Sequence, residues 1–137
     1  MPETPHPRVV LVVESVFDDE ILTLRALRRT GIPMRIEVER AGDAALARYR
    51  SDFLHAPPCL LVVSDKLLRV RADAVVDAVR ALHGRRSPAI LHLLSSEGHV
   101  AAAGADRAVV KPVDYLGYVG AVGTGVRHLL LTRDGAA

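Results

Sequence analysis

Three runs of this chain are apolar at almost every position, and many of their residues are β-branched. They lie at residues 9–13, 60–63 and 89–94, the last one directly after Pro88. A strand that is apolar throughout, without alternation, is typical of a parallel sheet that is covered on both faces. These runs therefore predict buried central strands, and they limit the possible folds more than any other feature of the sequence.

Segments with helical spacing separate the apolar runs. Helices are expected over 18–31, 42–54, 75–83 and 115–131, a helix of about two turns over 98–104, and further strands over 35–40 and up to 110. The alternation of charged and apolar residues in 35–40 indicates an edge strand. Strict βα alternation predicts an α/β fold: a doubly wound, flavodoxin-like parallel sheet with five strands and five helices, the fourth short.

The length of 137 residues corresponds to one domain. We expect this domain to span 8–133, between a flexible leader at 1–7 and a flexible tail at 134–137, with no separate output domain.

Composition excludes several classes of function. Eighteen basic and 16 acidic residues give a net charge of only +2, and there are two Phe, three Tyr and no Trp. Nucleic-acid binding by a basic or stacking surface is therefore not expected. Cys59 is the single cysteine, and no apolar run approaches the roughly 18 residues of a membrane span. We expect a cytoplasmic protein without membrane or nucleic-acid contact.

Polar residues gather where the predicted strands end. In open α/β sheets, functional sites form at the carboxyl ends of the strands. These ends carry Glu14 and Ser15, Ser64 and Asp65, Ser95, and Lys111.

The order of these motifs, with Gly104-Ala105-Asp106 before Val110-Lys111-Pro112, resembles the receiver (CheY-like) domain of bacterial two-component response regulators. The likeness spans roughly 8–131 and is greatest to small stand-alone receivers paired with phytochrome kinases. It implies phosphorelay signal transduction, with a sensor histidine kinase or another signalling protein as partner. In that family two acidic residues after the first strand hold Mg²⁺, and an Asp after the third strand accepts a phosphoryl group. A Lys pairs with the phosphoryl oxygens.

The phosphorylation site departs from that pattern. Glu14 occupies the first acidic position, but Ser15 occupies the second, and Ser64 falls on the acceptor position. Asp65 lies one residue later, where strand alternation turns a side chain to the opposite face unless the strand ends early or bulges. Magnesium prefers several anionic oxygen ligands, so one carboxylate should hold it weakly.

The family's switch residues are missing as well. Its hydroxyl position falls on Leu93, with Ser95 available only if the register slips by two, and its aromatic position falls on Ala108. The resemblance therefore implies an atypical pseudo-receiver that acts by protein–protein contact, with no enzymatic activity and no cofactor. The alternative is a phospho-accepting receiver that uses Asp65, with Glu14 holding Mg²⁺.

Other candidates have simpler structural explanations. Asp18 and Asp19 could act as replacement metal ligands, but their place before a helix favours N-terminal capping. Lys111 is expected to pair with Glu14, and the resemblance implies a cis Lys111–Pro112 bond. His92 lies in an apolar strand and is expected to be a hydrogen-bonded core residue.

The last helix suggests a homodimer. Val126, Leu129, Leu130 and Leu131 are candidate dimer contacts, because exposed apolar patches usually mark interfaces. The alternative is that these residues pack against their own core.

Overall fold

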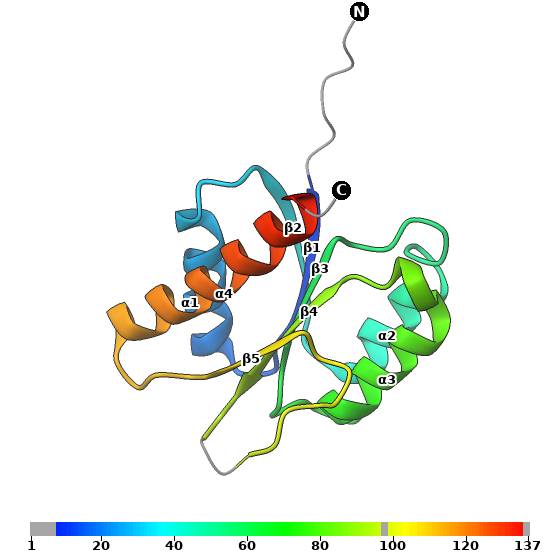
Figure 1. Cartoon of the computed structure of the whole chain (residues 1–137). Helices are drawn as coiled ribbons and strands as arrows, with labels where there is room; N and C mark the ends of the chain where they lie inside the picture. The colour runs from blue at the N-terminus through cyan, green and yellow to red at the C-terminus, as the bar shows by residue number, and fades with distance from the viewer. Residues whose placement is uncertain (1–7, 97–98, 136–137) are drawn as a thin grey trace, which may run out of the picture.

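The computed structural model describes residues 8–96 and 99–135. In it, five parallel strands form one sheet in the order β2-β1-β3-β4-β5 (Figure 1). The strands are β1 (Arg8–Val13), β2 (Met34–Glu39), β3 (Leu60–Ser64), β4 (Ala89–Leu94) and β5 (Arg107–Val110). The helices are α1 (Phe17–Arg29), α2 (Gly42–Arg50), α3 (Ala72–His83), the short 3₁₀ helix η1 (Gly84–Arg86) and α4 (Tyr115–Gly135). The doubly wound α/β fold and the edge position of β2 are confirmed.

The two faces of the sheet carry different helices. Helices α1 and α4 cover one face, and α2 and α3 cover the other (Figure 1). Side chains of β1 and β3 alternate between the two cores, with Val12 and Val62 toward α1 and α4, and Val13 and Val63 toward α2 and α3. This alternation decides which face each strand-end residue serves.

Helix α4 packs closely against α1. A Cβ at Gly123 would lie 3.6 Å from the carbonyl oxygen of Ala26, and the Tyr118 hydroxyl lies 2.9 Å from Oγ1 of Thr23. The candidate dimer contacts on α4 are mostly core residues: Val126, Leu129 and Leu130 are buried, and Leu131 alone among the four is exposed, at 52%. Val126, Leu129 and Leu130 therefore do not form an exposed patch, and the alternative that these residues pack against their own core is confirmed for them, because this part of α4 faces its own sheet.

The expected fourth helix is absent from the described part of its range, 99–104. Hydrogen bonds to side chains of β4 and α3 hold this connection in place instead. The backbone N–H of Ala102 donates to Nδ1 of His92, and Arg80 donates to the carbonyl oxygen of Gly104. These contacts hold the segment in the non-helical conformation that the structure shows. Helix α2 also ends earlier than expected, at Arg50.

The ends of the predicted domain fall partly outside the described residues. The leader at 1–7 lies wholly outside them, and α4 continues to Gly135, two residues beyond the expected domain end. Within 8–96 and 99–135, no helix is long and apolar enough to cross a membrane.

Gly42 and Gly120 offer a matched test of how closely the chain packs around its glycines. A Cβ at Gly42 would lie 2.4 Å from the carbonyl oxygen of Val70, whereas one at Gly120 would meet open space. We expect Gly42→Ala to lower the free energy of unfolding by about 1–3 kcal/mol through overpacking. Gly120→Ala should raise it by up to about 1 kcal/mol through helix propensity. Urea denaturation measures both, and an unchanged midpoint for Gly42→Ala would contradict the close contact.

Candidate functional site

The ammonium group of Lys111 lies at the centre of the strand-end residues. Its Nζ donates to Glu14 Oε1 at 2.8 Å, to Asp19 Oδ2 at 2.7 Å and to Ser64 Oγ at 2.6 Å. The side chains of Lys111 and Glu14 are only 8% and 1% exposed. The predicted pairing of Lys111 with Glu14 is confirmed, and these four residues are called the Lys111 cluster below.

Strand geometry explains why the cluster forms. Glu14 follows β1 and Ser64 ends β3, and the pairing of Val13 with Val63 places these two residues side by side. Lys111 follows β5, where its backbone N–H donates to the carbonyl oxygen of Leu94. The described part of the chain contains no cis peptide bond, so the expected cis Lys111–Pro112 bond is wrong. The Lys111 side chain reaches its partners from a trans peptide.

Asp19 is the member of the cluster that the sequence pattern did not predict. Helix α1 is capped by Val16 without a side-chain hydrogen bond, so neither Asp18 nor Asp19 makes a capping hydrogen bond, although both lie in the first turn, where acidic residues favour a helix. Asp19 lies in the first turn of α1 and turns toward Lys111 instead. Its position five residues after Glu14, next to the same strand end, was the available signal.

Ser15 connects the surrounding loops. Its hydroxyl donates to the carbonyl oxygen of Arg40 and accepts the backbone N–H of Leu68 at 3.0 Å. Beside this contact, Ala41 and Leu68 form an isolated parallel bridge. A neutral side chain therefore ties together the loops that follow β1, β2 and β3.

Asp65 faces away from the Lys111 cluster. Its carboxylate accepts the backbone N–H of Ser95 at 2.9 Å, the Ser95 hydroxyl, and Nδ1 of His99. Burial raises the pKa of Asp65, but the hydrogen bonds from His99 and Ser95 outweigh that effect and lower it from 3.8 to about 2. His99 was not predicted as a site residue, because it lies in the connection for which a helix was expected.

The predicted switch positions also lie outside the Lys111 cluster. Leu93 is buried in the core beneath α1 and α4, and Ala108 lies on β5 opposite His92. Ser95 is bonded to Asp65. Of the residues expected at the phosphorylation site, the structure therefore brings Glu14, Ser64 and Lys111 together.

The donor set of the cluster does not fit a magnesium ion. Its two carboxylates are both paired with the Lys111 ammonium, and its third oxygen is the hydroxyl of Ser64. Across residues 8–96 and 99–135, no three His, Cys, Asp or Glu side chains gather as a metal centre. Ser64 and Lys111 also do not form a nucleophile and base, because Nζ donates to all three partners.

Comparison with known proteins agrees with this architecture. No protein-family model matches the chain, and no curated protein matches it by sequence. Its fold is similar to that of the phosphorylated cyanobacterial phytochrome response regulator RcpA, with a TM-score of 0.80, 18% identity, and coverage of 93% of this chain and 96% of that one. The fold is also similar to that of the bacteriophytochrome response regulator RtBRR, with a TM-score of 0.70, 29% identity, and coverage of 85% of this chain and 76% of that one.

A third solved structure is RPA3017, a response regulator in red light signalling of R. palustris, with a TM-score of 0.71, 22% identity, and coverage of 90% and 93%. The chain therefore has the fold of response-regulator receiver domains. The resemblance to receivers that include phytochrome-associated regulators is confirmed.

The buried ion pair makes Lys111 important for stability. Lys111→Met leaves the Glu14 carboxylate buried without its cation, so we expect the free energy of unfolding to fall by about 3 kcal/mol. Adding Glu14→Gln should restore part of this loss, since it removes the unpaired charge. Lys66→Met, at an exposed lysine, should change stability by less than about 0.5 kcal/mol. Denaturant unfolding of the four proteins is the measurement, and a Lys111→Met protein as stable as the parent would contradict the pairing.

The low pKa of Asp65 predicts a dependence of stability on pH. A carboxyl group with a lowered pKa in the folded state contributes stability above its unfolded value of about 3.8, and this contribution disappears as the pH falls toward 2. We expect Asp65→Asn to be less stable than the parent at pH 5, with a gap that narrows between about pH 4 and pH 2. Asp77→Asn, at an exposed position in mid-helix, serves as the control. Urea titrations at stepped pH would contradict the prediction if the Asp65→Asn gap stayed constant.

Proposed function

We propose that this chain is a receiver-like protein of two-component signalling that has lost phosphoryl switching and acts by protein–protein contact. The observation that carries the proposal is the position of the Lys111 ammonium, which lies within 2.8 Å of Glu14, Asp19 and Ser64. The similarity to receiver domains supports the pathway. A sensor histidine kinase is the partner that this similarity favours, with another signalling protein as the alternative.

Charge in the Lys111 cluster supports the loss of metal binding. A dication needs oxygen ligands that are free to coordinate it. Glu14 and Asp19 are both occupied by an ammonium that is itself almost fully buried. A metal ion would have to displace Lys111, which would then lose both of its ion pairs.

The position of Ser64 supports the loss of the acceptor. Ser64 is 1% exposed, its hydroxyl is bonded to Lys111, and a hydroxyl is a weak nucleophile without a base beside it. The alternative function, with Asp65 as acceptor and Glu14 holding Mg²⁺, requires Asp65 beside Glu14. Asp65 is instead held by Ser95 and His99 on the other side of the strand end, which favours the pseudo-receiver.

Exposed apolar side chains support a role in protein contact. Phe17 at the start of α1 is 65% exposed, and Val113, just before α4, and Leu116, in its first turn, are also exposed. Both helices lie on the same face of the sheet, and Arg25 of α1 donates to the hydroxyl of Tyr115. Exposed apolar surface of this kind is typical of interaction sites. Homodimer formation stays a prediction. Of the four candidate dimer contacts on α4, Leu131 is the one that is exposed.

Binding of a phosphoryl analogue tests the proposal. Beryllofluoride with millimolar Mg²⁺, added to ¹⁵N-labelled protein, should leave the amide signals of Glu14, Ser64, Asp65 and Lys111 in place. Shifts clustered at these residues would show that the site still binds Mg²⁺ and the phosphoryl analogue, and would overturn the proposal.

Ser64→Asp is the positive control for this experiment. It adds a third carboxylate to the Lys111 cluster, so it should restore Mg²⁺-dependent shifts that the parent lacks. Incubation with acetyl phosphate followed by intact-mass measurement separates the alternative function. A phosphoryl adduct on the parent that is lost in Asp65→Ala would favour Asp65 as acceptor.

A further inference from the structure

A groove of about 650 Å³ lies between α3 and the connection that follows β4. Its walls are residues 71–73 and 77 of the α3 region and residues 99–103, and Asp65 and His92 complete its lining. It lies on the α2 and α3 face of the sheet, and residues 99–103 of its wall belong to the range in which a helix was expected. Its lining includes no member of the Lys111 cluster, so the groove is separate from the site described above.

The groove is negatively charged. Asp65, Asp73 and Asp77 line it, together with the Arg71 guanidinium, 3.4 Å from Asp73, and the His99 ring, which pairs with Asp65. Asp65 is held by Ser95 and His99, whereas Asp77 has no ion-pair partner among the described residues. Carboxylates in excess of cations favour a positively charged ligand.

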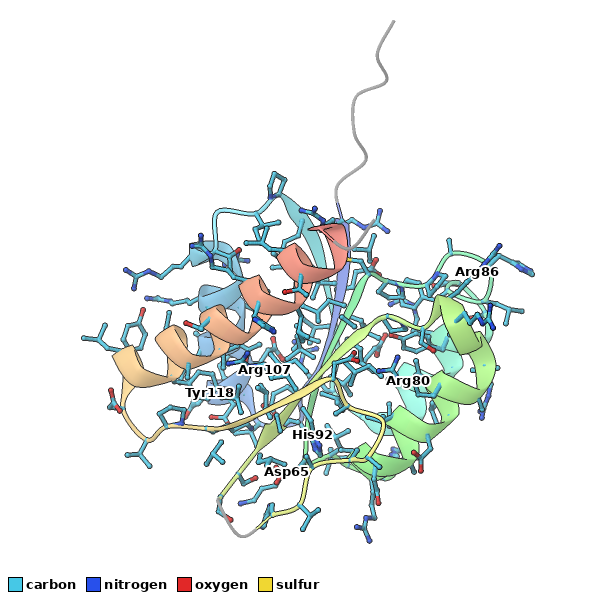
Figure 2. All side chains as sticks on the ribbon, in the orientation of Figure 1. Asp65, Arg80, Arg86, His92, Arg107 and Tyr118 are labelled. Carbon is cyan, nitrogen blue, oxygen red and sulfur yellow. The ribbon has the colours of Figure 1, made fainter. Side chains whose placement is uncertain are left out.

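His92 adds an observation that is independent of this charge. Its ring is 2% exposed and lies near Asp65 at the lower end of the sheet (Figure 2). Nδ1 accepts the backbone N–H of Ala102 at 3.1 Å, so the neutral ring carries its proton on Nε2. Burial lowers the pKa of His92 and keeps the ring neutral. Nε2 has no hydrogen-bond partner among the described residues, and a buried donor of this kind needs an acceptor.

The unpartnered donor of His92 and the charge of the groove together indicate a class of ligand. A carboxylate or phosphate oxygen would be disfavoured by the excess of carboxylates over cations in the groove, whereas a peptide carbonyl is a neutral acceptor. We propose that the groove binds a basic segment of a partner protein, with a backbone carbonyl on His92 and arginine or lysine side chains on Asp73 and Asp77. Because Nε2 is buried, residues 99–103 have to shift slightly for the carbonyl to reach it. This interaction does not depend on whether phosphoryl switching is lost.

A peptide titration tests the proposal. The probe is an acetylated, amidated hexapeptide with two arginines among glycine and alanine, added to the ¹⁵N-labelled chain. We expect amide shifts at residues 71–77, 92 and 99–103, with an affinity that falls as salt is added. The control peptide carries citrulline in place of arginine, which keeps the carbonyls and removes the charge, and it should bind much more weakly. Free agmatine, which has the guanidinium but no backbone carbonyl, should also bind more weakly.

Variants then assign the contacts. Asp73→Asn with Asp77→Asn should weaken binding of the arginine peptide roughly threefold to tenfold, since each exposed pair contributes modestly. Asp18→Asn with Asp43→Asn, two exposed acids outside the groove, should leave the affinity unchanged. His92→Phe should weaken binding by removing the donor. No shifts in the groove, equal binding of the citrulline peptide, or unchanged affinity in the Asp73 and Asp77 variant would each overturn the proposal.

Discussion

The ammonium of Lys111 is the interaction on which the carboxyl edge of this sheet depends. It joins the ends of β1, β3 and β5 to the first turn of α1 through Glu14, Ser64 and Asp19. A carboxylate as buried as Glu14 is costly unless a charge compensates it, and Lys111 supplies that charge. One monovalent cation thus pairs with both carboxylates of a site in which the family that this chain resembles uses several carboxylates and a dication. Serine at positions 15 and 64 is compatible with a single cation, because neither residue adds a negative charge.

Neutral contacts hold the loops around this cluster. The Ser15 hydroxyl bridges Arg40 and Leu68, and the backbone N–H of Gly42 donates to the carbonyl oxygen of Leu68. Gly42 fits beside Val70 only because it has no side chain, since a Cβ there would lie 2.4 Å from the carbonyl oxygen of Val70. These contacts need no bound ion, so the loops are positioned by the chain's own groups. A surface that is positioned in this way suits the proposed function, in which a partner recognises one fixed arrangement of the loops.

Local pattern was sufficient for the strands, because short runs such as 60–63, apolar at every position and rich in valine, are typical of parallel strands covered on both faces. It was not sufficient for side-chain direction. Acidic residues before a helix are typical of capping, and whether Asp19 turns inward depends on how α1 packs on the sheet. Three consecutive leucines cover about 200° of a helix, so the sequence alone could not decide which of Leu129, Leu130 and Leu131 would be buried. The helix expected over 98–104 is absent from its described part, 99–104, for a similar reason, because contacts with His92 and Arg80 fix that segment.

Strand alternation separates two neighbouring residues into different roles. Ser64 continues the series of Val62 toward α1 and α4 and joins Lys111, while Asp65 continues the series of Val63 toward α2 and α3. On that second face Asp65 binds the connection after β4 through Ser95 and His99. The same carboxylate cannot hold this connection and also face Glu14 across the strand end. The negative charge near the third strand is therefore present in this chain, but it stabilises the wall of the groove on the α3 face instead of the Lys111 cluster.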